Sequence, residues 1–239
     1  MSDRPSQSPS AGYRPTVSDE EAERIREWHD RAYRKALVDG STTLTFDYLG
    51  LSVLVPPGVQ PVTAMSHLLG EAVLAEAGEQ DTVLDMGTGC GINGLLAASK
   101  GAQVVAVDIN PYALDAARSN AKRNGLLDHV EVRHSDVFSA VEERFDLIIF
   151  DPPFRWFAPR DWLEAATTDE NYLALTAFFG QARRHLSPSG RMLIFFGTSG
   201  DLGYMKKLVV AEGFHAQVVA HQEVVRDDRE VGYFTFKLT

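Results

Sequence analysis

The chain has 239 residues, of which 44% are hydrophobic and 23% are charged, and this is the composition of an ordinary globular protein with room for one α/β domain. Its formal net charge of -10 argues against a duplex- or rRNA-binding surface, which normally carries a basic patch, although an acidic protein can hold a local one. No apolar run approaches the roughly 18 residues of a membrane span, so we expect a protein that does not enter a membrane. The N-terminus lacks the apolar region of a signal peptide, and the single Cys90 allows no internal disulfide. We therefore expect the protein to be cytoplasmic.

The N-terminal region combines a polar tail with one long helix. Residues 1–17 are rich in Ser, Pro and Arg, and we expect them to form a disordered tail. Ser18 is typical of an N-cap, and the pattern after it predicts a helix over 19–38 that stops at Gly40. The apolar residues of this helix fall on one stripe, Ile25, Trp28, Ala32 and either Ala36 or Leu37, with Tyr33 beside it. Two interpretations stay open: a helix packed on the body, or a lid over a pocket whose aromatic side chains contact a ligand.

A short hairpin and a second helix are predicted before the core. Strands over 42–48 and 51–55 flank Leu49-Gly50, and a Pro-Pro-Gly run ends the second strand. An amphipathic pattern predicts the helix over 62–77. We therefore divide the chain into a disordered tail (1–17), an N-terminal region of helical lid, β-hairpin and helix (18–80), and a core (81–239).

Strands and helices alternate through most of the core. The predicted strands are 82–86, 103–108, 130–134, 145–150 and 191–196, and the predicted helices are about 91–99, 110–124, 169–186 and 201–212. Continuous apolar strands indicate a sheet buried on both faces, and the alternation predicts a doubly wound, Rossmann-like, mostly parallel α/β sheet. The last two strands, 214–225 and 231–238, are joined so briefly that they must form an antiparallel C-terminal hairpin.

The most specific stretch of the core is a glycine turn that follows its first strand. Asp85 ends the strand, and Gly87, Gly89 and Gly91 follow at every second position before a predicted helix. A helix start offers unpaired backbone N–H groups, and glycine lets a flat ligand approach the backbone closely. The run matches G-x-G-x-x-G, which alone suggests a dinucleotide site, but Asp108 also ends the next strand, about 20 residues on, where an acid can accept both ribose hydroxyls.

With its preceding acid, this turn resembles the nucleoside-binding motif of class I S-adenosylmethionine-dependent methyltransferases. The resemblance implies that the turn passes beside the ligand, that Asp108 holds its ribose and that Asp85 lies near its methionine amino end. It also implies that Asp136, or the backbone beside it, contacts the adenine amino group. The S-adenosylmethionine-binding residues expected on this basis are Asp85, Gly87, Thr88, Gly89, Gly91, Asp108, Ile109, Asp136, Val137 and Asp151.

A second motif, Asp151-Pro152-Pro153-Phe154, directly follows the predicted strand over 145–150. The two prolines stiffen the backbone and remove two N–H donors, which leaves the Asp151 side chain and the Pro152 carbonyl as a rigid row of acceptors beside an aromatic ring. Such a set is suited to receive an N–H₂ group and to stack its planar carrier. It resembles the (N/D)-P-P-(F/Y/W) motif of amino-methyltransferases, which act on adenine, guanine, glutamine amide or free amines. We therefore expect Asp151, Pro152 and Phe154 to be the catalytic residues.

The stretch over 46–63 resembles the hairpin and proline-rich turn that precede the core of the protein-glutamine and rRNA guanine/adenine N-methyltransferases, the methyltransferase small domain group. Two departures stand out, because the release-factor enzymes of that group usually carry Asn where Asp151 stands and have a larger N-terminal helical domain. An anionic aspartate favours an amine that becomes cationic, so a small-molecule amine or amide acceptor is expected.

Three alternatives to a small acceptor remain open. The same pocket could cyclise S-adenosylmethionine to azetidine-2-carboxylate and methylthioadenosine. The acceptor could instead be an RNA or DNA base or a protein glutamine, or the chain could be a regulator without enzymatic activity.

An aromatic loop follows the second motif, and it could wall a pocket, stack a base or pack on the N-terminal helix. The candidate substrate contacts are Trp28, Tyr33, Thr63, Trp156 and Phe157. The histidines show no metal-ligand spacing, so no metal is expected. The sequence leaves the oligomeric state undetermined.

Overall fold

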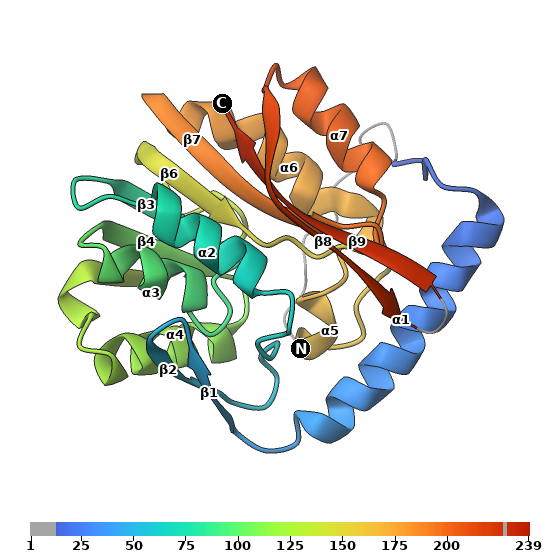
Figure 1. Cartoon of the computed structure of the whole chain (residues 1–239), viewed down its shortest axis with the longest axis horizontal. Helices are drawn as coiled ribbons and strands as arrows, with labels where there is room; N and C mark the ends of the chain where they lie inside the picture. The colour runs from blue at the N-terminus through green and yellow to red at the C-terminus, as the bar shows by residue number, and fades with distance from the viewer. Residues whose placement is uncertain (1–12, 227–228) are drawn as a thin grey trace.

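The computed structural model describes residues 13–226 and 229–239, and within them the main sheet has seven strands in the order β5-β4-β3-β6-β7-β9-β8 (Figure 1). Its strands are β3 (Thr82–Met86), β4 (Gln103–Asp108), β5 (Val130–His134), β6 (Phe145–Phe150), β7 (Leu186–Gly197), β8 (Ala216–Arg226) and β9 (Arg229–Leu238). The first five of these pair in parallel, and β9 pairs antiparallel with both β7 and β8. The predicted Rossmann-like sheet with an antiparallel C-terminal hairpin is confirmed.

Helices cover both faces of this sheet. The helices are α1 (Asp19–Asp39), α2 (His67–Glu76), α3 (Ile92–Ser99), α4 (Pro111–Arg123), α5 (Trp162–Ala165), α6 (Leu173–Ala182) and α7 (Leu202–Ala211), with short 3-10 turns η1 (Leu127–His129), η2 (Glu170–Tyr172) and η3 (Arg183–His185). Figure 1 shows α2 and α3 in front of the sheet and α6 behind it. Because both faces are covered at its centre, the inner strands β3 and β6 are mainly apolar, and β6 is buried at nearly every position.

Two predicted helices differ from the observed ones. The helix predicted over 62–77 begins only at His67, because a turn closed by hydrogen bonds between Thr63 and Ser66 occupies the preceding residues. The helix predicted over 169–186 is interrupted near its start, where Asn171 and Tyr172 adopt left-handed φ values of 53° and 49°. Left-handed residues cannot continue an α-helix, so α6 begins only after them.

The N-terminal hairpin packs against α4. Its strands β1 (Leu44–Tyr48) and β2 (Leu51–Val55) pair antiparallel, and its two-residue loop has positive φ at both Leu49 and Gly50, as a type I′ turn requires. The side chain of Asn120 on α4 accepts from the N–H of Leu54 and donates to its carbonyl, and Asn124 does the same for Ser52. These bonds hold the hairpin against the C-terminal end of α4.

Helix α1 crosses the side of the domain next to the β8–β9 hairpin and α5 (Figure 1). Ser18 caps it by accepting from the N–H of Glu21, as predicted. The predicted apolar stripe is wrong in the second half of the helix, because Ile25 and His29 are buried whereas Leu37 is exposed. That half extends past the body toward β1, so it has little to pack against.

Only part of the expected disordered tail is described, since residues 1–12 lie outside the described residues. Residues 13–17 do not extend away from the body. Tyr13 and Thr16 donate hydrogen bonds to the carboxylate of Asp201, at the start of α7. The N-terminal segment 13–17 is thus part of the folded body.

Candidate active site

The glycine turn lies at the carboxyl end of β3. Gly87, Gly89 and Gly91 have φ values of 64°, 57° and 93°, in the left-handed region that favours glycine. A Cβ added to Gly89 would have no atom within 4 Å. The backbone of the turn therefore borders open space at the edge of the sheet where ligands of doubly wound folds bind.

Asp85 holds this turn together from beneath. Its side chain is buried, and its Oδ2 accepts from the Thr88 hydroxyl at 2.5 Å and from the Gly94 N–H at 2.9 Å. Burial, with a smaller contribution from the nearby Asp108 carboxylate, raises the pKa of Asp85 to about 6, although the hydrogen bonds from Thr88 and Gly94 oppose this rise. The contacts seen are with the turn and α3, and the proximity of Asp85 to a methionine amino group remains a prediction.

Asp108 stands at the end of the neighbouring strand β4, beside the turn. Its two carboxylate oxygens accept from the N–H groups of Gly89, at 2.9 Å, and Asn110, at 2.8 Å. Burial is the main cause that raises its pKa. Asp108 and the following Ile109 are half-buried, so the carboxylate is fixed at the strand end, and its contact with a ribose stays a prediction.

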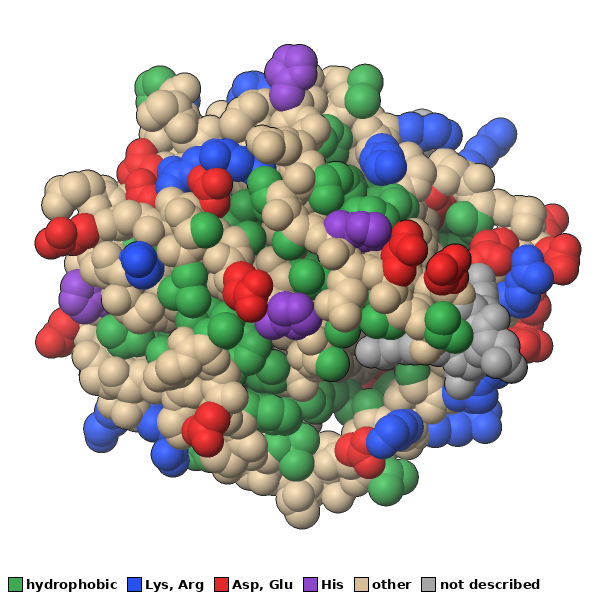
Figure 2. Space-filling model, in the orientation of Figure 1, with side chains coloured by type: hydrophobic (Ala, Val, Ile, Leu, Met, Phe, Trp, Pro, Cys, Tyr) green, Lys and Arg blue, Asp and Glu red, His purple; other side chains and the backbone are tan. Residues whose placement is uncertain are grey.

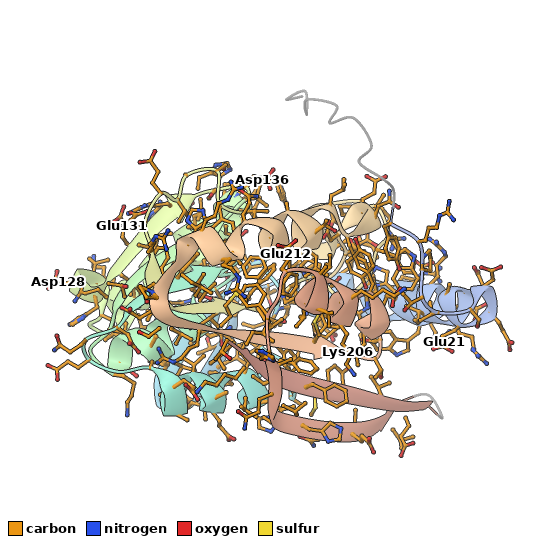
Figure 3. All side chains as sticks on the ribbon, turned by 90° about the horizontal axis from the view of Figure 1, so that it is seen from above. Glu21, Asp128, Glu131, Asp136, Lys206 and Glu212 are labelled. Carbon is orange, nitrogen blue, oxygen red and sulfur yellow. The ribbon has the colours of Figure 1, made fainter. Side chains whose placement is uncertain are left out.

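The loop after β5 brings Asp136 to the same edge. Val137 has a φ of 49°, which is unusual for a β-branched residue, and its carbonyl accepts from the Ser135 hydroxyl at 2.7 Å. The Ser135 N–H in turn donates to the Asp108 carbonyl at 3.1 Å. Asp136 itself is exposed and projects outward in Figure 3. The loop is thus tightly folded around an outward-facing acid next to β4.

Asp151 follows β6, the other neighbour of β3. The residue is exposed, but protein atoms surround much of its carboxylate. This partial removal from water raises the pKa of Asp151 to about 7. The Asp85 carboxylate adds to the rise, and the Arg155 guanidinium opposes it. In Figure 2 a hollow opens in the molecular surface between α1 and the segment that joins β2 to α2 (Figure 1).

The Phe154 ring is turned inward. It lies among the rings of Phe195, Phe196 and Tyr233, with centroid distances of 5.6, 5.0 and 6.3 Å, and it is 8% exposed. Pro152 is buried as well. Of the three residues predicted to be catalytic, Asp151 is the one whose side chain is open to solvent.

The carboxylates at this edge make it suitable for a cationic ligand. Asp85 interacts electrostatically with Asp108 and with Asp151, and each interaction raises a pKa. A positive ligand would offset this repulsion, and S-adenosylmethionine carries both a sulfonium and an ammonium group. The open space at Gly89 and the paired oxygens of Asp108 fit the nucleoside part of the same molecule.

The aromatic loop packs mainly on α1 and the N-terminal segment. Trp156 and Phe157 are buried, the Tyr13 ring lies 5.8 Å from Trp156, and the Arg26 guanidinium lies 4.1 Å from the Phe157 ring centre. Trp28 lies 4.7 Å from the Arg155 guanidinium. The packing interpretation of α1 and this loop therefore agrees with the contacts.

The remaining candidate contacts are similarly engaged. The Tyr33 hydroxyl donates to Asp161 at 2.6 Å, and Thr63 is exposed in the turn before α2. Two hollows of about 120 and 340 Å³ border α1. Trp28 lines the smaller hollow, and Trp156 and Phe157 line the larger. A role for these side chains in substrate binding stays a prediction.

Several buried polar residues near the motif gave no signal in the sequence. Arg155 donates to Ser199 at 3.2 Å, and Glu164 accepts from His29 at 2.8 Å and from Arg160. Tyr172 donates to the Phe154 carbonyl. Apart from the Arg160–Glu164 pair, these partners are distant in sequence, so no local spacing could have marked them. In the described part of the chain, no group of three or more His, Cys, Asp or Glu side chains is arranged to hold a metal.

Three features lie on one edge of this doubly wound sheet: the glycine turn, the acid that ends the next strand, and the Asp-Pro-Pro-Phe motif on the other side. Together they define the S-adenosylmethionine-dependent methyltransferase class. The chain belongs to the methyltransferase small domain family, whose model matches residues 60–224. The resemblance drawn from the sequence, the enzyme class and the cofactor, S-adenosylmethionine, are confirmed by this match.

Named relatives include a release factor glutamine methyltransferase of Cereibacter sphaeroides, 38% identical over 54% of this chain and 50% of its own length. Another is the ribosomal RNA small subunit methyltransferase C of Haemophilus influenzae, 39% identical over 47% of this chain and 31% of its own. A solved structure, the T. Thermophilus 16S rRNA N2 methyltransferase in complex with AdoMet and guanosine, matches 80% of this chain and 49% of that one with a TM-score of 0.56 and 26% identity. The chain thus spans half or less of the length of these three proteins.

Among the residues the structure describes, no helix combines the length and apolarity needed to cross a membrane.

Proposed function

We propose that this protein transfers the methyl group of S-adenosylmethionine to a nitrogen of a macromolecular acceptor, and that this acceptor is the side-chain amide of a protein glutamine. The observation that carries the proposal is the Asp151-Pro152 pair, which offers acceptors for N–H groups at the same strand edge as the glycine turn. The relatives' names favour the macromolecular alternative over the small acceptor expected from the sequence. The net charge of -10 favours protein over RNA, because RNA-binding surfaces are basic.

The residues of this chain would mainly bind and align. S-adenosylmethionine supplies an activated methyl group, so the bond from sulfur to carbon breaks as the bond from nitrogen to carbon forms. The Pro152 carbonyl and the Asp151 carboxylate would accept the two N–H groups of the acceptor and aim its lone pair at the methyl group. Such alignment contributes several kcal/mol, on the order of 7–11 in well-oriented systems.

Asp151 has a second task once nitrogen is methylated. The nitrogen becomes positive and must lose a proton, and an anionic side chain beside it stabilises that charge. With a pKa raised to about 7, Asp151 is suited to accept the proton near neutral pH. The rigid proline backbone keeps both oxygens in place while this occurs.

The carboxylate at this position also supports a small amine as a second candidate acceptor. An amine becomes fully cationic on methylation, and the negative charge of Asp151 would favour it more than it favours an amide. The two candidates differ in what they label, so one assay separates them.

The test incubates the full chain and methyl-labelled S-adenosylmethionine with a glutamine-containing protein extract, a small-amine mixture or 16S rRNA. We expect label in protein, as N-methylated glutamine after proteolytic digestion that leaves the side-chain amide intact. Asp151→Ala should abolish turnover and leave S-adenosylmethionine affinity within a few-fold of the wild type. Full activity of Asp151→Ala would contradict the role given to the motif, and label in RNA or small amines would replace the acceptor class.

A reaction without acceptor tests the cyclase alternative. Methylthioadenosine formed from S-adenosylmethionine alone would indicate cyclisation, whereas S-adenosylhomocysteine formed only with acceptor indicates methyl transfer.

A further inference from the structure

A hydrogen-bond relay joins the N-terminal segment 13–17 to the Asp-Pro-Pro-Phe motif. It runs from Tyr13 through Asp201 and Tyr172 to the carbonyl of Phe154. Its middle members, Asp201 and Tyr172, have no exposed surface. None of Tyr13, Asp201 and Tyr172 is among the site residues predicted from the sequence.

Tyr172 is the link that touches the motif. Its hydroxyl donates to the Phe154 carbonyl and accepts from the Asp201 N–H at 2.8 Å. The other side of the same carbonyl is crowded, because a Cβ added to Gly200 would lie 1.9 Å from it. The Phe154 carbonyl therefore lies between the Tyr172 hydroxyl and Gly200, where any larger residue would clash with its oxygen.

The backbone that carries this hydroxyl is strained. Asn171 and Tyr172 are consecutive non-glycine residues in the left-handed region. The strained turn is held by the Asn171 N–H, which donates to the Trp156 carbonyl at 3.0 Å, and by Asp169, whose carboxylate accepts from the N–H groups of Ala174 and Leu175. Strain maintained by several bonds is typical of functional positions.

Asp201 connects this turn to the N-terminal segment. It caps α7 by accepting from the Tyr204 N–H at 2.9 Å. It also accepts from the Tyr13 hydroxyl at 2.9 Å, from the Thr16 N–H at 2.6 Å and from the Thr16 hydroxyl. Burial and the Asp201 carboxylate raise the pKa of Tyr13, so its hydroxyl stays a donor.

From this relay we infer that Tyr172 is a positioning residue for methyl transfer, and that docking of the N-terminal segment 13–17 onto Asp201 sets the geometry of the Pro152 carbonyl and Asp151. The inference rests on the proposed function for its effect on turnover. Its effect on the motif backbone is independent of any acceptor. Since Phe154 lies two residues after Pro152 on a stiff backbone, movement of its carbonyl moves the acceptor-binding oxygens as well.

The experiment compares Tyr172→Phe, Tyr13→Phe and their double variant with the matched control Tyr204→Phe. Tyr204 stacks on Tyr172 with ring centroids 5.5 Å apart, but its hydroxyl pairs with Thr176 instead of the relay. Each variant keeps its ring, and Tyr13→Phe lies at the outer end of the relay, so it tests the idea even if Tyr172→Phe does not fold.

We expect Tyr172→Phe to lower kcat about tenfold or more, with KM for the labelled acceptor and affinity for S-adenosylmethionine within about twofold. Tyr13→Phe should lower kcat less, and the double variant should be no worse than Tyr172→Phe, because both break one relay. Tyr204→Phe should keep kcat within about twofold. Equal losses in Tyr204→Phe and Tyr172→Phe would overturn the inference in favour of a merely structural cluster.

Amide hydrogen exchange supplies a readout that needs no acceptor. Exchange at Arg155 and Trp156 should accelerate about tenfold in Tyr172→Phe and stay near the wild-type rate in Tyr204→Phe. Unchanged exchange in Tyr172→Phe refutes the relay whatever the activity of the wild type. Faster exchange together with a wild-type chain that methylates nothing supports the relay and contradicts only the proposed function.

Discussion

Replacement of Gly89 by alanine tests whether the open space at the glycine turn is the cofactor site. Gly89 has a φ of 57°, and an added Cβ would meet no atom within 4 Å. The folded protein should therefore lose only the cost of a left-handed alanine, about 1–2 kcal/mol, because no clash adds to it. For a chain of this size that corresponds to a decrease in Tm of about 2–8 °C.

Gly125 provides the matched control. It also has a positive φ, 69°, and an added Cβ there would likewise meet nothing within 4 Å, but it lies after α4, away from the turn. Gly125→Ala should show the same decrease in Tm as Gly89→Ala. The difference between the two variants in ligand affinity then isolates the effect of a methyl group placed in the open space at the glycine turn.

Calorimetric titration with S-adenosylmethionine is the assay. Gly89→Ala should bind at least about tenfold more weakly than the wild type, which is about 1.4 kcal/mol, whereas Gly125→Ala should bind equally well. Thermal stabilisation by the ligand should be reduced in Gly89→Ala alone. Equal affinity of Gly89→Ala and the wild type would refute the reasoning that the ligand occupies this space.

Three further outcomes are expected. Because folding raises the pKa of Asp151, the folded chain binds more protons than the unfolded chain between about pH 4 and 7, so this group lowers stability as pH rises. The free energy of unfolding of Asp151→Asn should therefore gain about 1 kcal/mol relative to the wild type from about pH 5 to 8, after discounting for solvent screening. Denaturant titrations measure this difference, and a difference that stays constant with pH would contradict the argument. Burial alone would raise the pKa of Glu164, but hydrogen bonds from Arg160 and His29 lower it to about 2. Glu164→Gln should therefore lower the free energy of unfolding by about 3 kcal/mol and expose α1 to proteolysis. The control Glu27→Gln, at an exposed position, should do neither. Val137→Gly should relieve the left-handed strain at this residue and keep Tm within about 3 °C of the wild type. A larger decrease in Tm in a thermal scan would show that packing of the Val137 side chain outweighs the relief of backbone strain.

The parts of the site that a short run of residues specifies could be predicted from the sequence. The turn from Asp85 to Gly91 needs glycine at fixed spacing, and Asp108 needs only to end the next strand. Parallel pairing then brings these groups and Asp151 to one edge. Cofactor class therefore followed from local pattern and topology together.

The parts that depend on contacts distant in sequence could not be predicted. The apolar pattern over 169–186 continues through Asn171 and Tyr172, so nothing marks their left-handed backbone. The Phe154 ring was expected to face a substrate, but β9 supplies Tyr233 as a neighbour that turns it into the core. Likewise, no spacing in the chain links Tyr13 to Asp201, because the pair forms only when the two ends of the domain meet.

The insertion of β9 between β7 and β8 has a consequence for biosynthesis. Both neighbours of β9 precede it in the chain, so a growing polypeptide presents two strands before the one that must separate them. Until Tyr233 arrives, the Phe154 ring lacks one of the side chains it packs against. A nascent chain still on the ribosome would thus hold a complete glycine turn while its Asp-Pro-Pro-Phe motif lacks part of its packing until β9 has been made.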